Sequence, residues 1–187
     1  ARMVLRHPDV DLAVLETARG GLMRRGLVLD SVDTAVVTNV SNDHLGAWGI
    51  RSVDDMAEVK MSVGFGVKAG GSLILNADCP VLKSAYQRLQ FRLKGRRLLW
   101  FSSQTTLNMN AWYARSRLWL RINDEPQAVV HVDEVPILLG GAAKHNVENA
   151  LAALCAAQQL GLSVKAMAAG LSSLLGKIGI PGVPAFD

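Results

Sequence analysis

The sequence is poor in cysteine, aromatic residues and charge, and each shortage excludes a class of protein. Its two cysteines, Cys79 and Cys155, provide neither a disulfide framework nor the spacing of a metal-binding motif. Aromatic residues make up 5% of the chain, too few for a surface that stacks nucleic-acid bases. No apolar run approaches the roughly 18 residues of a membrane span, and no secretory signal pattern is present. We therefore expect a cytoplasmic protein that folds without disulfides.

The residues that are abundant indicate a globular α/β protein. Half of the 187 residues are hydrophobic and 19% are charged, which excludes a disordered chain. A chain of this length buries enough surface to fold without a stabilising metal or disulfide. The formal net charge is +4, and the basic stretches are short, so a mildly basic surface explains the charge better than nucleic-acid binding does. We expect neither a nucleic-acid nor a membrane partner.

Short, nearly continuous apolar runs predict parallel strands that are buried on both faces. These runs are residues 11–16, 33–40 and 72–76. Between the second and third runs, residues 52–67 predict a helix with Ser52 as its N-cap, which gives a βαβ unit. A helix at residues 80–89 and a strand at residues 97–101 extend the pattern.

The pattern changes after residue 110. Alternating residues at 112–122 and 127–139 flank a turn-like Asn-Asp-Glu-Pro stretch, which predicts antiparallel hairpins. Helical patterns return at 144–160 and 163–175, and residues 176–187 are typical of a linker or tail. We predict one α/β domain over residues 1–175, in which helices flank a mostly parallel sheet with a small added antiparallel section.

Polar residues follow the first predicted strand, at the edge where open α/β sheets bind ligands. Glu16 ends that strand, and a carboxylate there can either bind Mg²⁺ or cap the next turn. Thr17, Arg19 and Gly20-Gly21 come next. A hydroxyl, a guanidinium and flexible backbone favour an anion, whereas the alternative is a plain turn.

A second group of polar residues follows residues 33–40. His44 offers a nitrogen ligand for a metal, with Asp43 placed to orient it, or is an ordinary hydrogen-bonding histidine. Lys60 lies on the next predicted helix among apolar residues. Either it is a surface lysine, or its neutral amine reacts with CO₂ to give a carbamate, a carboxylate on a long arm that suits Mg²⁺.

Two asparagines mark the start of the helix predicted at residues 144–160. Asn146 and Asn149 are three residues apart and therefore share a face of that helix. Their amides offer a donor and an acceptor together, which matches the Watson–Crick edge of adenine. Ordinary capping of the helix is the alternative.

Together these motifs resemble the Mur ligase superfamily of ATP-dependent amide ligases, and within it the ligase portion of the cyanophycin synthetases. The most characteristic segment is residues 14–27, which contains the run Glu-Thr-Ala-Arg-Gly-Gly. The stretches 37–50 and 75–78 also match. The similarity covers residues 1–101 and 140–175, whereas the hairpins between them resemble only the general layout.

The resemblance implies a P-loop NTPase-like fold and a role for each candidate residue. Glu16 and His44 would match the family's Mg²⁺ ligands, and Lys60 its carbamylated lysine, which binds the metal through the carbamate. Asn146 and Asn149 would match the pair that contacts adenine.

The resemblance also implies the reaction and its substrates. Thr17 and Arg19 would lie near the phosphates of ATP or the acceptor carboxylate. ATP would convert a carboxylate into an acyl phosphate, which an amine attacks to give an amide, ADP and phosphate. The implied substrates are ATP, an acidic amino acid or peptide, and an amine such as arginine.

The sequence departs from the family pattern in three places. The glycine-rich phosphate loop ending in Gly-Lys-Thr is not found, the family's linker arginine is replaced near residues 180–183, and Cys79 stands where the family has Asp. We therefore expect a central domain truncated at both ends that is inactive alone. The alternative is a degenerate, non-catalytic Mur-like domain acting as a scaffold or binding module. A homo-oligomer is left open.

Overall fold

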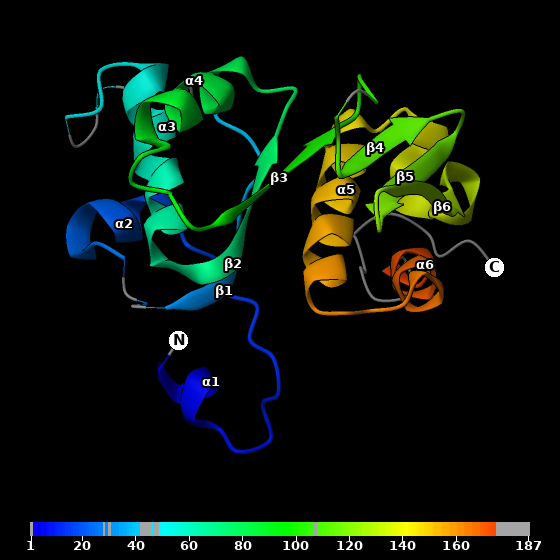
Figure 1. Ribbon diagram of the computed structural model, residues 1–187, viewed down its shortest axis with the longest axis horizontal. Helices are drawn as coiled ribbons and strands as arrows, with labels where there is room; N and C mark the ends of the chain where they lie inside the picture. The colour runs from blue at the N-terminus through cyan, green and yellow to red at the C-terminus, as the bar shows by residue number, and fades with distance from the viewer. Residues whose placement is uncertain are drawn as a thin grey trace, which may run out of the picture.

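The computed structural model describes residues 2–27, 29, 31–41, 46, 49–106 and 108–174 (Figure 1). Its first half contains helices α1 (Arg2–Arg6), α2 (Arg19–Arg25), α3 (Val53–Met61) and α4 (Pro80–Leu89), the 3₁₀ turn η1 (Ser62–Gly66), and strands β1 (Val32–Val37), β2 (Val67–Asn76) and β3 (Arg97–Ser102). Its second half contains strands β4 (Ala111–Ala114), β5 (Arg117–Ile122) and β6 (Glu125–His131), the 3₁₀ turns η2 (Val132–Glu134) and η3 (Pro136–Gly141), and helices α5 (Lys144–Gln159) and α6 (Val164–Ser172). None of these described helices is long and apolar enough to cross a membrane.

The six strands form one sheet, and their order in the sheet is their order in the chain. Strands β1 to β4 pair in parallel, and β4 to β6 pair antiparallel. The two sections join where Phe101 pairs with Ala111 and Ser102 with Trp112. The predicted mostly parallel sheet with an antiparallel section is confirmed.

Helices cover both faces of the sheet. Leu73 and Leu75 of β2 pack with α3 and α4 on one face, whereas Ile74 packs with α5 on the other, because neighbouring strand residues point to opposite faces. Helix α5 runs opposite to β2 (Figure 1), and Ser72 at the start of the strand's regular pairing donates to Gln159 at the end of the helix, at 2.9 Å. The N-terminus of α5 therefore lies at the carboxyl edge of the sheet.

The predicted cap of α3 is confirmed. Ser52 Oγ accepts from the backbone N–H of Asp55 at 3.0 Å, and the Asp55 carboxylate accepts from the N–H of Ser52 at 3.0 Å. The N–H of Arg51 also donates to Asp55, and these bonds lower the pKa of its carboxyl group. The helix ends at Met61, earlier than predicted, and β2 begins at Val67.

The strand predicted at residues 11–16 is wrong, because this segment is not part of the sheet. Leu12 is exposed, and Val14 is 90% exposed. A strand that is buried on both faces needs a neighbouring strand and a packed layer on each side. The described residues provide neither for this segment, so its apolar pattern alone does not make it a strand.

The flexible backbone expected at Gly20 and Gly21 is not found. Arg19 to Arg25 form the short helix α2, so Gly20 and Gly21 are helical residues and not flexible loop positions. The N–H of Gly21 donates to the carbonyl of Ala18 at 2.9 Å. This backbone donor is therefore already used and is not free to bind an anion.

The two-residue turn between β4 and β5 gives a prediction for stability. Arg115 and Ser116 both have positive φ, at 51° and 56°, which suits Asn and Gly. Replacing them by Asn and Gly should raise the free energy of unfolding by about 1 kcal/mol. Urea unfolding measures the gain. The same Asn-Gly replacement at Asn123 and Asp124 is the comparison, and it should gain less because that turn already begins with Asn. A loss of stability on replacing Arg115 and Ser116 would contradict the turn assignment.

Candidate functional site

The carboxyl ends of β1, β2 and β3 and the N-terminus of α5 meet at one edge of the sheet. Open α/β sheets bind ligands at this edge, because loops and helix N-termini present polar groups there. Three of the predicted site residues, Lys60, Asn146 and Asn149, can be placed relative to this edge.

Lys60 lies in the last turn of α3 and reaches the end of β1. Its side chain is half-buried, and Nζ donates to the backbone carbonyl of Asn39 at 2.9 Å. Among the described residues, no carboxylate forms an ion pair with Lys60. The amine of Lys60 therefore lies at the sheet edge against a neutral acceptor. Converting this amine into a carbamate would break no ion pair among the described residues.

Asn146 and Asn149, near the start of α5, have different surroundings. Asn146 is half-buried, and its Nδ2 donates to the carbonyl of Ile137 at 2.7 Å, whereas Asn149 is exposed. The N-cap of α5 is Ala143, which makes no side-chain cap. The capping alternative is therefore wrong for both asparagines, and Asn149 is the more exposed of the two.

Glu148 on the same turn was missed by the sequence reasoning. Its side chain is only 7% exposed, and it faces Lys144 at 3.7 Å and His145 at 4.0 Å. A buried carboxylate near a helix N-terminus is stabilised by the helix dipole and by the Lys144 ammonium group. The helical spacing of the three residues indicates the grouping, but nothing in the sequence indicates the burial.

Asp78 organises the loop after β3 and was not assigned a role from the sequence. Its carboxylate accepts from Ser102 Oγ at 2.5 Å and from the N–H and Oγ of Ser103 at 2.7 and 2.8 Å. Ser102 Oγ in turn accepts from the N–H groups of Gln104 and Thr105. These bonds tie the carboxyl ends of β2 and β3 together and fix the backbone at the edge.

The remaining predicted residues are not brought together. Glu16 and Thr17 are exposed just before α2, and Arg19 is half-buried at its start. No described hydrogen bond or ion pair joins Glu16 to Lys60, and the described residues contain no group of three or more His, Cys, Asp or Glu that could hold a metal. His44 lies outside the described residues.

Both cysteines are buried. Cys79 lies just before α4 and its Sγ is 3.8 Å from the carbonyl of Val40, so the thiol fills a core position between two loops. Burial raises the pKa of the Cys155 thiol to about 12, so this thiol stays protonated at neutral pH and is a poor nucleophile.

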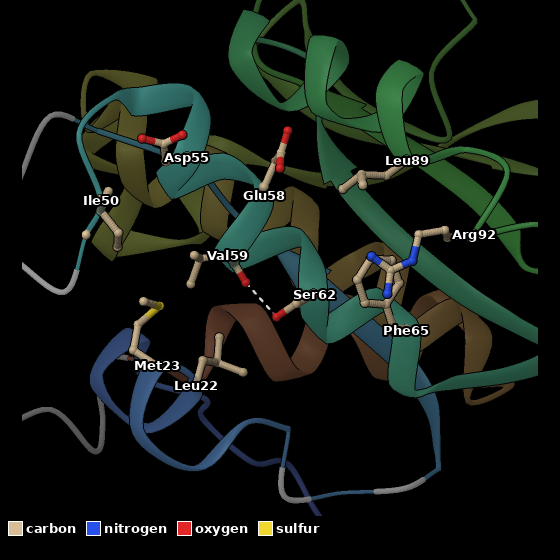
Figure 2. Close-up of a pocket in the computed structure, with 11 residues that line it drawn as sticks. Leu22, Met23, Ile50, Asp55, Glu58, Val59, Ser62, Phe65, Leu89 and Arg92 are labelled. Carbon is tan, nitrogen blue, oxygen red and sulfur yellow. Dashed lines mark hydrogen bonds between the residues drawn. The ribbon is translucent and has the colours of Figure 1, made fainter.

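A groove of about 450 Å³ lies between α2 and α3 (Figure 2). Figure 2 shows Leu22 and Met23 of α2 facing Val59 of α3 across it, with Arg92 stacked on the ring of Phe65 at 3.9 Å. None of the residues predicted from the sequence lines this groove. The groove and the predicted site are therefore separate features.

Comparisons of sequence identify relatives. A family model described as the Mur ligase middle domain matches residues 2–157. The chain is 34% identical over 179 residues to the cyanophycin synthetase of Crocosphaera subtropica, covering 91% of this chain and 20% of that protein. It is 31% identical over 135 residues to the UDP-N-acetylmuramoylalanine–D-glutamate ligase of Acidobacterium capsulatum, covering 71% of this chain and 27% of that protein.

The fold has a solved counterpart. The structure of a UDP-N-acetylmuramoyl-L-alanyl-D-glutamate–2,6-diaminopimelate ligase superposes with a TM-score of 0.63 at 25% identity. The match covers 89% of this chain and 32% of that structure. The chain thus spans about a fifth of the length of the cyanophycin synthetase and about a third of the length of the solved ligase.

Proposed function

The chain belongs to the Mur ligase middle domain family, and from this membership we propose that it is the ATP-binding part of an enzyme that forms amide bonds. One observation of the structure supports the proposal most directly. Lys60 on one face of the sheet and the start of α5 on the other, with its exposed Asn149, both lie at the carboxyl edge. A nucleotide at this edge would reach both.

The proposed reaction has two steps. A carboxylate oxygen attacks the γ-phosphorus of ATP and releases ADP, which leaves an acyl phosphate. An amine nitrogen then attacks the acyl carbon, phosphate leaves and the nitrogen loses a proton, which gives the amide. The resemblance to cyanophycin synthetases supports an acidic amino acid or peptide as the carboxylate and an amine such as arginine.

In this proposal the chain's residues bind and orient the nucleotide. Asn149 pairs with the edge of adenine, and Thr17 and Arg19 contact the phosphates or the acceptor carboxylate. Lys60, after its neutral amine adds CO₂ and loses a proton, supplies a carboxylate at the end of β1. Its surroundings fit this role, because Nζ is held by a single neutral carbonyl.

Mg²⁺ belongs to the same proposal. Glu16, His44 and the Lys60 carbamate are the residues that would hold it. The ion would neutralise charge on the transferred phosphoryl group. The exposed carboxylate of Glu16 leaves it free to serve as an oxygen ligand, which is the ligand type that Mg²⁺ prefers.

The proposal is tested with the protein expressed from its complete open reading frame. Release of ADP should require Mg²⁺, a carboxylate substrate and an amine, and mass spectrometry should detect the amide. Asn149→Ala should raise the KM for ATP about tenfold with little change in kcat, because it removes a contact to the base that ground and transition states share. Gln87→Ala, an exposed amide on α4, is the matched control and should behave like wild type. Absence of ATP turnover with every carboxylate and amine pair would argue against a ligase.

A further inference from the structure

The amino edge of the sheet, opposite the candidate site, carries exposed cations that the proposed function does not use. Strands β1, β2 and β3 are parallel, so their first residues lie together at this edge. Arg97 is the first residue of β3, and Lys68 is the second residue of β2. Arg92 and Lys94 lie in the turn between α4 and β3. All four residues are exposed, and we call them the amino-edge cluster.

Hydrogen bonds hold the segments that carry this cluster together. Arg97 Nε donates to the carbonyl of Gly70 at 3.1 Å, which joins the start of β3 to the first turn of β2. Arg96 is half-buried, and its guanidinium donates to the carbonyls of Val67 and Arg92, both at 2.9 Å. Arg96 is therefore a structural residue, and the four exposed cations around it are presented on backbone that is fixed by these bonds.

The cluster has little negative charge to balance it. Lys68 forms an ion pair with Asp33, and both side chains of that pair are exposed. Among the residues that the structure describes, no carboxylate forms an ion pair with Arg92, Lys94 or Arg97. Like charges gathered on one edge repel one another, so the cluster lowers the stability of the fold until an anion covers it.

An exposed aromatic side chain adjoins the cluster. Phe91 is 85% exposed, and its carbonyl accepts from the N–H of Lys94 at 3.4 Å, so the two residues belong to one tight turn. Arg92, between them, stacks its guanidinium on the ring of Phe65 at 3.9 Å (Figure 2). Aromatic residues and arginine are the residue types in which protein interfaces are enriched. The edge thus combines an apolar contact with unbalanced positive charge.

We propose that the amino-edge cluster and Phe91 bind an acidic segment of a partner protein that also carries an apolar side chain. Arginine pairs with a carboxylate through two parallel hydrogen bonds, and contacts within the chain already orient the guanidinium groups of Arg92 and Arg97. Carboxylates along the partner segment neutralise these two arginines and Lys94, and the apolar side chain covers Phe91. The charge complementarity selects an acidic partner.

The cluster fits other anionic partners less well. Single-stranded nucleic acids bind to several aromatic side chains on which successive bases stack, whereas Phe91 is the one exposed aromatic residue in the described part of this edge. A membrane surface is bound by a broad apolar face beside the cations, and a single phenylalanine does not provide one. The inference does not depend on the proposed function, because the candidate site lies at the other end of the sheet.

Fluorescence anisotropy with the protein from its complete open reading frame tests this surface. The probe is a labelled peptide of aspartates and glutamates around a single leucine. Lys94→Glu combined with Arg97→Glu should weaken binding about tenfold or more, because it replaces attraction by repulsion. Phe91→Ala should weaken binding about threefold. The affinity of the wild type should also fall as salt is added, since the charges are exposed.

The matched control reverses two other exposed charges. Arg115→Glu combined with Arg117→Glu, between β4 and β5, should bind the peptide like wild type. The variant with both Lys94→Glu and Arg97→Glu should release ADP at the wild-type rate, which separates this surface from a site for an acidic substrate. Lys94→Gln should unfold at an equal or higher temperature because it removes repulsion, whereas a structural role would lower that temperature.

Several results would overturn the proposal. One is wild-type affinity for the peptide in the Lys94→Glu and Arg97→Glu variant, and another is equal binding of a neutral peptide of asparagines and glutamines. Tighter binding of oligothymidylate or of phosphatidylserine vesicles, lost in the same variant, would assign the surface to a nucleic acid or a membrane instead. Self-association in ultracentrifugation that this variant abolishes would assign it to a second copy. If the wild type turns over ATP but binds no acidic peptide, this inference is wrong and the proposed function stands.

Discussion

Lys60→Ala is expected to lower the rate of amide formation about a hundredfold or more, because it removes the group proposed to become a carboxylate at the end of β1. The fold should survive, since the lysine is half-buried and makes one described hydrogen bond, to the carbonyl of Asn39. Assays of ADP release and amide formation by the protein from its complete open reading frame measure the loss. Lys83→Ala, an exposed lysine on α4, is the matched control and should have no effect.

Two further measurements separate the carbamate from an ordinary lysine charge. Lys60→Arg keeps a positive charge and a donor for Asn39 but cannot add CO₂, so it should be as inactive as the alanine variant. Added acetate should restore part of the activity of Lys60→Ala, because a small carboxylate can occupy the space of the missing carbamate. An active arginine variant would show that the charge alone matters.

Phe101→Ala is expected to lower the free energy of unfolding by about 3–5 kcal/mol, the largest effect on stability that we anticipate. Phe101 is fully buried on β3, in the cluster that α5 covers, and pairs with Asn76 on one side and Ala111 on the other. Its truncation leaves a cavity where the parallel and antiparallel sections join. Urea unfolding of the chain, followed by tryptophan fluorescence, measures the loss.

The control for this prediction is Phe91→Ala. Phe91 follows α4 and is 85% exposed, so its truncation should change stability by less than about 0.5 kcal/mol. Phe101→Leu, which keeps most of the buried volume, should cost less than Phe101→Ala. Equal effects at Phe91 and Phe101 would mean that the join between the two sections is not a packed core.

The elements that were predictable from the sequence are those whose partners are also present in the chain. Strands β2 and β3 have continuous apolar runs and are buried between helices on both faces, whereas β1 leaves Val36 exposed. Residues 11–16 have the same pattern but are exposed at Val14. An apolar run indicates that a segment can be buried. Whether it is buried depends on the strands and helices that pack against it.

The hydrogen-bond partners of the site residues could not be predicted from the sequence, because these partners are backbone groups. The partners of Lys60 and Asn146 are the carbonyls of Asn39 and Ile137, which carry no residue-specific pattern. The join between β3 and β4 likewise depends on two residue pairs, too few for an apolar period to register. The residue types at the site were therefore predictable, but the separate surroundings of the two asparagines were not.

The match between strand order and chain order has a consequence for how the protein is made on the ribosome. Each strand pairs with the one synthesised just before it, so the sheet can grow as the chain emerges, without leaving a gap for a later strand. The main contact that must wait is α5 against β2, where Gln159 meets Ser72 across 87 residues. The start of α5 would then reach the sheet edge only when synthesis of the domain is nearly complete.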